Sequence, residues 1–142
     1  MNERSYTHGR LTAPGPGRGP GAERHREETS AIDLSIELRR ADGWIVVSVE
    51  GELDLYTAPQ LRDAVMGAVE DGSKRVVVDL TKVPFMDSSG LGVVVACLKR
   101  LRESGGDLAV VTPPESPPTK LLSLTGLDRA ITTRATLDEV IS

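Results

Sequence analysis

The sequence is poor in aromatic residues, cysteine and histidine, and each shortage narrows what the chain can do. Aromatic residues make up only 3% of the 142 residues, so the core must be built from aliphatic side chains. The one cysteine, Cys97, has no partner within the chain for a disulfide, and a reducing compartment suits it. Both histidines, His8 and His25, fall in the first thirty residues, so neither a Ser-His-Asp arrangement nor a His/Cys metal cluster is indicated.

Long apolar runs and phosphate-binding loops are also missing from the sequence. No apolar run approaches the roughly 18 residues of a membrane-spanning helix, and no signal-peptide pattern opens the chain. The sequence has neither a Gly-x-x-x-x-Gly-Lys-Ser/Thr loop nor a Gly-x-Gly-x-x-Gly loop. We therefore expect a cytoplasmic protein that is not an enzyme and has no cofactor, no metal and no membrane contact.

Charge is distributed unevenly along the chain. Residues 1–30 hold five arginines and four glutamates, whereas residues 31–142 hold twelve basic and seventeen acidic residues. An acidic domain does not attract nucleic acid, so nucleic acid is not an expected partner. Such acidity would suit a partner with a basic face, although it is more often a property of a soluble surface alone.

Composition divides the chain into a tail and one domain. Eight of the thirteen residues from Gly9 to Gly21 are Gly or Pro, and an Arg/Glu-rich stretch follows them. Such a segment cannot bury enough apolar surface to offset the entropy lost on ordering. Residues 1–30 are therefore predicted to be a disordered tail, and residues 31–142 a single folded domain.

Hydrophobic periodicity predicts five strands and four helices in that domain. The predicted strands are 32–38, 44–49, 76–80, 107–111 and 131–133. The predicted helices are 57–71, 89–103, 119–125 and 136–141. An Asp-Gly turn at residues 41–43 joins the first two strands into an antiparallel hairpin, and the later alternation of strands and helices implies a mostly parallel α/β sheet.

Capping signals mark several helix starts. Thr57 with Gln60 fits a capping box, and Thr136 with Glu139 fits a second one. Ser88 is predicted to be the N-cap of the helix that follows the third strand. The 119–125 helix is expected to turn its three leucines inward, Leu121, Leu122 and Leu124.

Polar turns follow the carboxyl ends of two predicted strands. Asp54 comes after the second strand, and Asp87-Ser88-Ser89 comes after the third. Both turns therefore lie at the carboxyl edge of the sheet, where α/β proteins bind ligands and partners, and we expect them to lie side by side. Spacing alone favours a turn or capping carboxylate over a functional one for Asp54, and a helix N-cap over a functional serine for Ser88.

Three segments, in this order, resemble the signature of the anti-sigma factor antagonists of the STAS domain family. They are Glu50–Asp54, Phe85–Gly92 and Lys120–Leu127. The resemblance covers roughly residues 31 to 142 and implies a four- to five-stranded sheet with helices mainly on one side. It also implies that the unphosphorylated protein binds an anti-sigma factor, which is a serine kinase, and thereby frees a sigma factor.

The resemblance further implies which residues form the site. Ser88 corresponds to the serine that the kinase phosphorylates, and a phosphoserine phosphatase would reset it. The expected partner-binding residues are Asp54, Asp87, Ser88, Ser89 and Gly90, and the expected oligomeric state is a monomer or a weak dimer. The alternative is a STAS scaffold or transporter-associated module without a kinase partner, which the serine in its full motif disfavours.

Overall fold

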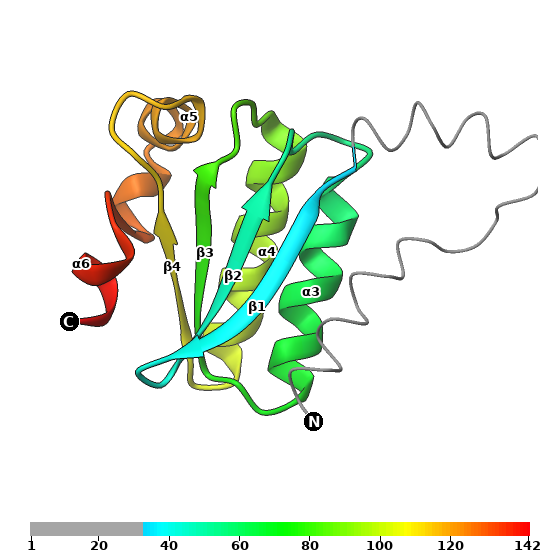
Figure 1. Ribbon diagram of the computed structural model, residues 1–142, viewed down its shortest axis with the longest axis vertical. Helices are drawn as coiled ribbons and strands as arrows, with labels where there is room; N and C mark the ends of the chain where they lie inside the picture. Colours follow the sequence, from blue (N-terminus) through cyan, green and yellow to red (C-terminus); the bar gives the residue numbers. More distant parts are fainter. Residues whose placement is uncertain (1–32) are drawn as a thin grey trace, which may run out of the picture.

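The computed structural model describes residues 33–142, which form a five-stranded sheet flanked by helices (Figure 1). The strands are β1 (Ser35–Ala41), β2 (Trp44–Glu50), β3 (Arg75–Lys82), β4 (Asp107–Val111) and β5 (Thr132–Arg134). They lie in sequence order, with β1 antiparallel to β2 and the other pairs parallel. The predicted mostly parallel sheet opened by a hairpin is confirmed, whereas the predicted tail, residues 1–30, lies outside the described residues.

Helices follow the strands in the predicted order. They are α3 (Ala58–Glu70), α4 (Ser88–Glu103), α5 (Pro117–Thr125), the 3-10 helix η1 (Leu127–Arg129) and α6 (Leu137–Ile141). The two long helices, α3 and α4, lie side by side on one face of the sheet (Figure 1). No helix within residues 33–142 is long and apolar enough to span a bilayer.

The main core lies between the sheet and these two helices, and it is aliphatic. Alternate residues of the central strands point into it, among them Val47 and Val78, because side chains of a strand alternate between its two faces. Each helix contributes one apolar stripe, for example Leu61 and Val65 from α3. Burying each such side chain contributes roughly 1.5–3 kcal/mol, so the core needs none of the scarce aromatic residues.

Cys97 lies in the buried stripe of α4, where it acts as a small apolar residue. Burial raises the pKa of the Cys97 thiol from 9.0 to about 11, and the nearby Arg62 guanidinium opposes this rise. The thiol therefore keeps its proton at neutral pH, which makes it a poor nucleophile.

The opposite face of the sheet is covered in part by α6. Val46, Val77 and Val111 form a second apolar cluster there, and Leu137 and Val140 of α6 pack against it. This cluster is much smaller than the main core. The prediction that helices lie mainly on one side of the sheet is therefore confirmed.

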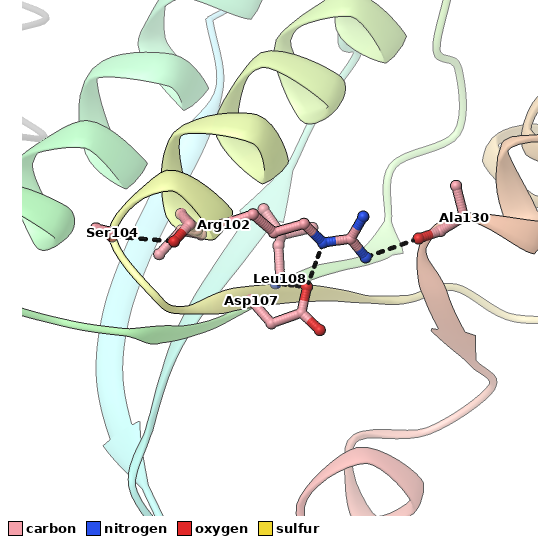
Figure 2. Close-up of polar contacts among 6 residues, drawn as sticks. Arg102, Ser104, Asp107, Leu108 and Ala130 are labelled. Carbon is pink, nitrogen blue, oxygen red and sulfur yellow. Dashed lines mark hydrogen bonds and ion pairs between the residues drawn. The ribbon is translucent and has the colours of Figure 1, made fainter.

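The C-terminal end of α4 is attached to β4 and to the segment before β5 (Figure 2). Arg102 Nε donates to Asp107 Oδ1 at 3.1 Å, and Arg102 Nη2 donates to the carbonyl oxygen of Ala130 at 2.9 Å. Both side chains of the ion pair are half exposed, so solvent screens it and its contribution is below about 1 kcal/mol. The two bonds together orient the end of the helix rather than hold the fold.

Three predictions about the last helices need correction. Ser116 caps α5, so this helix begins at Pro117 and not at Thr119. Leu124 is 84% exposed, because it is two positions from buried Leu122 and successive helical residues are about 100° apart. At α6 the hydroxyl of Thr136 accepts from the Glu139 N–H as predicted, but the Glu139 carboxylate reaches one residue further back, to the N–H of Ala135.

Candidate functional site

Two loops meet at the carboxyl edge of the sheet, one between β2 and α3 and one between β3 and α4. Leu53 and Met86 form an isolated parallel β-bridge between these loops. The N–H of Leu53 donates to the carbonyl of Phe85 at 2.9 Å, and the N–H of Asp87 donates to the carbonyl of Leu53 at 3.1 Å. The expectation that the Asp54 turn and the Asp87 turn lie side by side is confirmed, and the two loops form one hydrogen-bonded unit.

Asp87 is the N-cap of α4, so the prediction that Ser88 is the cap is wrong. Asp87 Oδ1 accepts from the N–H of Ser89 at 2.8 Å and from the N–H of Gly90 at 3.4 Å. Its backbone is extended, as an N-cap requires, whereas Ser88 is the first helical residue. The Asp87 carboxylate, one position earlier, thus accepts the hydrogen bonds from the first turn of α4 that the Ser88 hydroxyl was expected to accept.

Ser88 stands at the surface of the first turn of α4. Its side chain is exposed, whereas the neighbouring Ser89 is half-buried. Within residues 33–142 the Ser88 hydroxyl has no hydrogen-bond partner, so it is free to meet another protein. Gly90 is buried, and the structure therefore places it beneath this surface rather than on it.

Asp54 shapes the other loop. Asp54 Oδ1 accepts from the N–H of Tyr56 at 2.9 Å, from the N–H of Thr57 at 3.0 Å and from Thr57 Oγ1 at 3.2 Å. These are the bonds of a turn-forming carboxylate. The structure thus gives Asp54 a structural role at the same edge as Ser88.

The capping box predicted for Thr57 and Gln60 is not formed. Thr57 is only 1% exposed, and its hydroxyl donates to the carbonyl of Glu52 at 2.8 Å and accepts from the N–H of Asp54 at 2.9 Å. Gln60 N–H bonds instead to the Thr57 carbonyl oxygen. The hydroxyl is turned into the loop because the Asp54 turn provides partners there, so the side chain makes no capping bond to α3.

Sequence reasoning missed a group of exposed apolar side chains at this edge. Leu55, Tyr56 and Phe85 are 64%, 76% and 46% exposed, and all three belong to the two joined loops. The available signal was the pair of large apolar residues directly after Asp54, in a turn where polar residues are usual. Among residues 33–142, no three His, Cys, Asp or Glu side chains gather as a metal ion would require.

Comparison with known proteins identifies the class to which this fold and site belong. The family model described as the STAS domain matches residues 35–140, which is most of the chain. The chain belongs to the STAS domain family.

Its relatives within this family carry a more specific description. The chain is 38% identical, over 80 residues, to the anti-sigma-B factor antagonist of Staphylococcus aureus, which is 56% of this chain and 74% of that protein. The crystal structure of an anti-sigma factor antagonist from Mycobacterium paratuberculosis is 35% identical with a TM-score of 0.68, covering 75% of this chain and 89% of the other. The Bacillus cell fate determinant SpoIIAA in its phosphorylated form is 26% identical with a TM-score of 0.57, covering 75% and 96%.

Proposed function

We propose that this protein is an anti-sigma factor antagonist that is switched off by phosphorylation of Ser88. Its unphosphorylated form binds an anti-sigma factor in the cytoplasm, so that a sigma factor is released. The anti-sigma factor is also a serine kinase, and transfer of phosphate from ATP to Ser88 ends the complex until a phosphatase removes the phosphate. The protein is thus the substrate of this reaction and not its catalyst.

One observation carries the proposal. Ser88 is an exposed hydroxyl on the first turn of a helix, directly after the capping Asp87 and at the edge where two hydrogen-bonded loops meet. The resemblance of residues 85–92 to the family signature implies a phosphorylated serine at this position, and one structural relative was solved in a phosphorylated form. The exposure of the side chain means that a kinase can reach it without unfolding the helix.

Electrostatics explains how a phosphate on Ser88 would end the complex. A phosphoserine adds about −1.5 to −2 charges at neutral pH, beside the carboxylate of Asp87. Leaving such a charge buried and unpaired in an interface costs on the order of 2–5 kcal/mol, which corresponds to a roughly thirty- to several-thousand-fold loss of affinity. The switch therefore needs no refolding of the domain.

Phosphopeptide mapping tests the proposal. The purified protein is incubated with ATP and, one at a time, with each serine-kinase anti-sigma factor encoded by the source organism. We expect one of them to modify Ser88, the Ser88→Ala variant to stay unmodified, and the Ser89→Ala variant to accept phosphate as wild type does. Phosphate on Ser89 with an untouched Ser88 would contradict the assignment, and no modification by any of the kinases would favour a STAS scaffold without a kinase partner.

A further inference from the structure

Exposed large apolar side chains are concentrated on the two loops at the edge of the sheet where α4 begins at Ser88. Within residues 33–142 four such side chains are exposed, and three of them lie on the two loops joined by the Leu53–Met86 bridge. These three are Leu55, Tyr56 and Phe85, and the fourth is Leu124 on α5. Exposed apolar groups that gather in one place, unlike scattered ones, mark a surface that another molecule covers.

The shape of the loop does not depend on the side chains of Leu55 and Tyr56. The turn is held by the Asp54 carboxylate, which accepts from the backbone N–H of Tyr56 and of Thr57, while the Tyr56 ring remains 76% exposed. The neighbouring residues Leu53 and Thr57 are buried and supply the packing. Leu55 and Tyr56 therefore need a different explanation from loop stability.

The loop presents these side chains from a fixed backbone. Asp54 and the bridge to Met86 anchor it at both ends, so little backbone entropy remains to be lost when a partner binds. Aromatic side chains are enriched at the centres of protein interfaces, where a few of them carry most of the binding energy. A rigid loop that exposes Leu55 and Tyr56 is therefore suited to form the centre of a protein–protein interface.

We propose that Leu55, Tyr56 and Phe85 form the apolar contact that holds the anti-sigma factor. Ser88, at the same edge of the sheet, controls whether this contact can form. The inference rests on the proposed function, and it adds the chemistry of the partner. The anti-sigma factor must carry an apolar depression next to the mouth of its kinase site. The three apolar side chains then provide the affinity for the anti-sigma factor, and Ser88 provides the switch.

Binding measurements with three matched variants test this division. The probe is the purified anti-sigma factor that phosphorylates Ser88, titrated calorimetrically with ADP in place of ATP so that no phosphate is transferred. Leu55→Ser and Tyr56→Ser are expected to weaken binding at least about tenfold, since both remove central apolar contacts. Leu124→Ser removes a leucine of α5 that is even more exposed than Leu55 and should bind within about twofold of wild type. Thermal unfolding checks that all three variants are folded.

The outcomes separate the inference from the proposed function. If wild type is phosphorylated on Ser88 while Leu55→Ser and Tyr56→Ser bind as tightly as it does, the apolar contact is wrong and the switch stands. A loss as large for Leu124→Ser would also overturn the inference, because the contact would not be confined to the two loops. If no anti-sigma factor of the organism binds wild type, the proposed function fails and the inference fails with it.

Discussion

Gly90 lies directly against the side chain of Leu53. A Cβ atom added at Gly90 would be 2.7 Å from Leu53 Cγ and 2.9 Å from Met86 Cγ. Carbon atoms in contact are normally about 3.5–4.0 Å apart. Since Leu53 and Met86 are the two bridge residues, the missing side chain of Gly90 is what allows α4 to begin so close to the junction of the loops.

We predict that Gly90→Ala destabilises the protein by about 1–3 kcal/mol, because the new methyl group overpacks the buried Leu53 and Met86. Gly92→Ala is the matched control, since it adds the same methyl group to the same helix at an exposed position, where apart from its chain neighbours and the adjacent helix backbone no atom lies within 4 Å. There the higher helix propensity of alanine should add up to about 1 kcal/mol. Urea unfolding of both variants measures the difference, and equal free energies of unfolding would contradict the packing argument.

Replacing Asp54 separates its structural role from any role of its charge. Asp54→Ala removes the acceptor of the backbone N–H groups of Tyr56 and Thr57, so we expect a loss of about 1–2 kcal/mol in the free energy of unfolding. Asp54→Asn keeps one oxygen at this position and should lose clearly less. Initial phosphorylation rates of the Asn variant then report on the charge alone. An Ala variant as stable as wild type would show that these hydrogen bonds do not hold the loop.

Ser88→Asp should imitate the phosphorylated protein only in part. Aspartate adds one negative charge and lacks the phosphate oxygens, so its affinity for the anti-sigma factor should fall between those of wild type and of the phosphorylated protein. Ser88→Ala removes only a hydroxyl from an exposed position and should bind as wild type does. Calorimetric titration orders the four forms. Binding of Ser88→Asp as tight as that of Ser88→Ala would show that charge at this position does not control the complex.

Cys97 should make the protein less stable at alkaline pH. Burial raises the pKa of its thiol to about 11, so between about pH 9 and 11 the folded chain keeps a proton that the unfolded chain loses. The free energy of unfolding contributed by this group therefore falls as pH rises through that window, by at most about 1.4 kcal/mol per pH unit. Cys97→Ala retains every other titrating group and is expected to show a shallower decline in urea unfolding from pH 8 to 11. Parallel declines would contradict a shifted thiol.

Much of the fold could be predicted because periodicity and turn residues agree with the final packing. Residues 41–43 were expected to turn, and Asp42 and Gly43 do adopt positive φ values of 52° and 86°. The first strand was predicted to end at residue 38, three residues before its observed end at Ala41, because Arg39 and Arg40 do not follow the apolar alternation. Both nevertheless pair with β2, since the antiparallel ladder continues up to the turn.

The site was harder to predict in detail, because several adjacent polar side chains can accept the same backbone N–H groups and the sequence does not show which of them does. Ser88 was predicted to be the N-cap, but the Asp87 carboxylate takes the role and accepts from two N–H groups. Thr57 had a capping-box partner in sequence, yet its hydroxyl found closer partners at Glu52 and Asp54. The sequence shows two large apolar residues at positions 55 and 56 of a turn, but their exposure follows only from the structure, in which the neighbouring Leu53 and Thr57 take the buried positions.

The two capping bonds of Asp87 bear on how long a phosphate would survive on Ser88. An anion at a helix start is normally cradled by backbone N–H groups, which shield it. Here the N–H groups of Ser89 and Gly90 are already engaged by the Asp87 carboxylate. A phosphate on the exposed Ser88 would find these donors occupied, would be repelled by the same carboxylate, and would remain hydrated and turned outward. If Ser88 is phosphorylated as proposed, Asp87 would thereby leave the phosphate accessible to a phosphatase, because the helix N-terminus would not bind it.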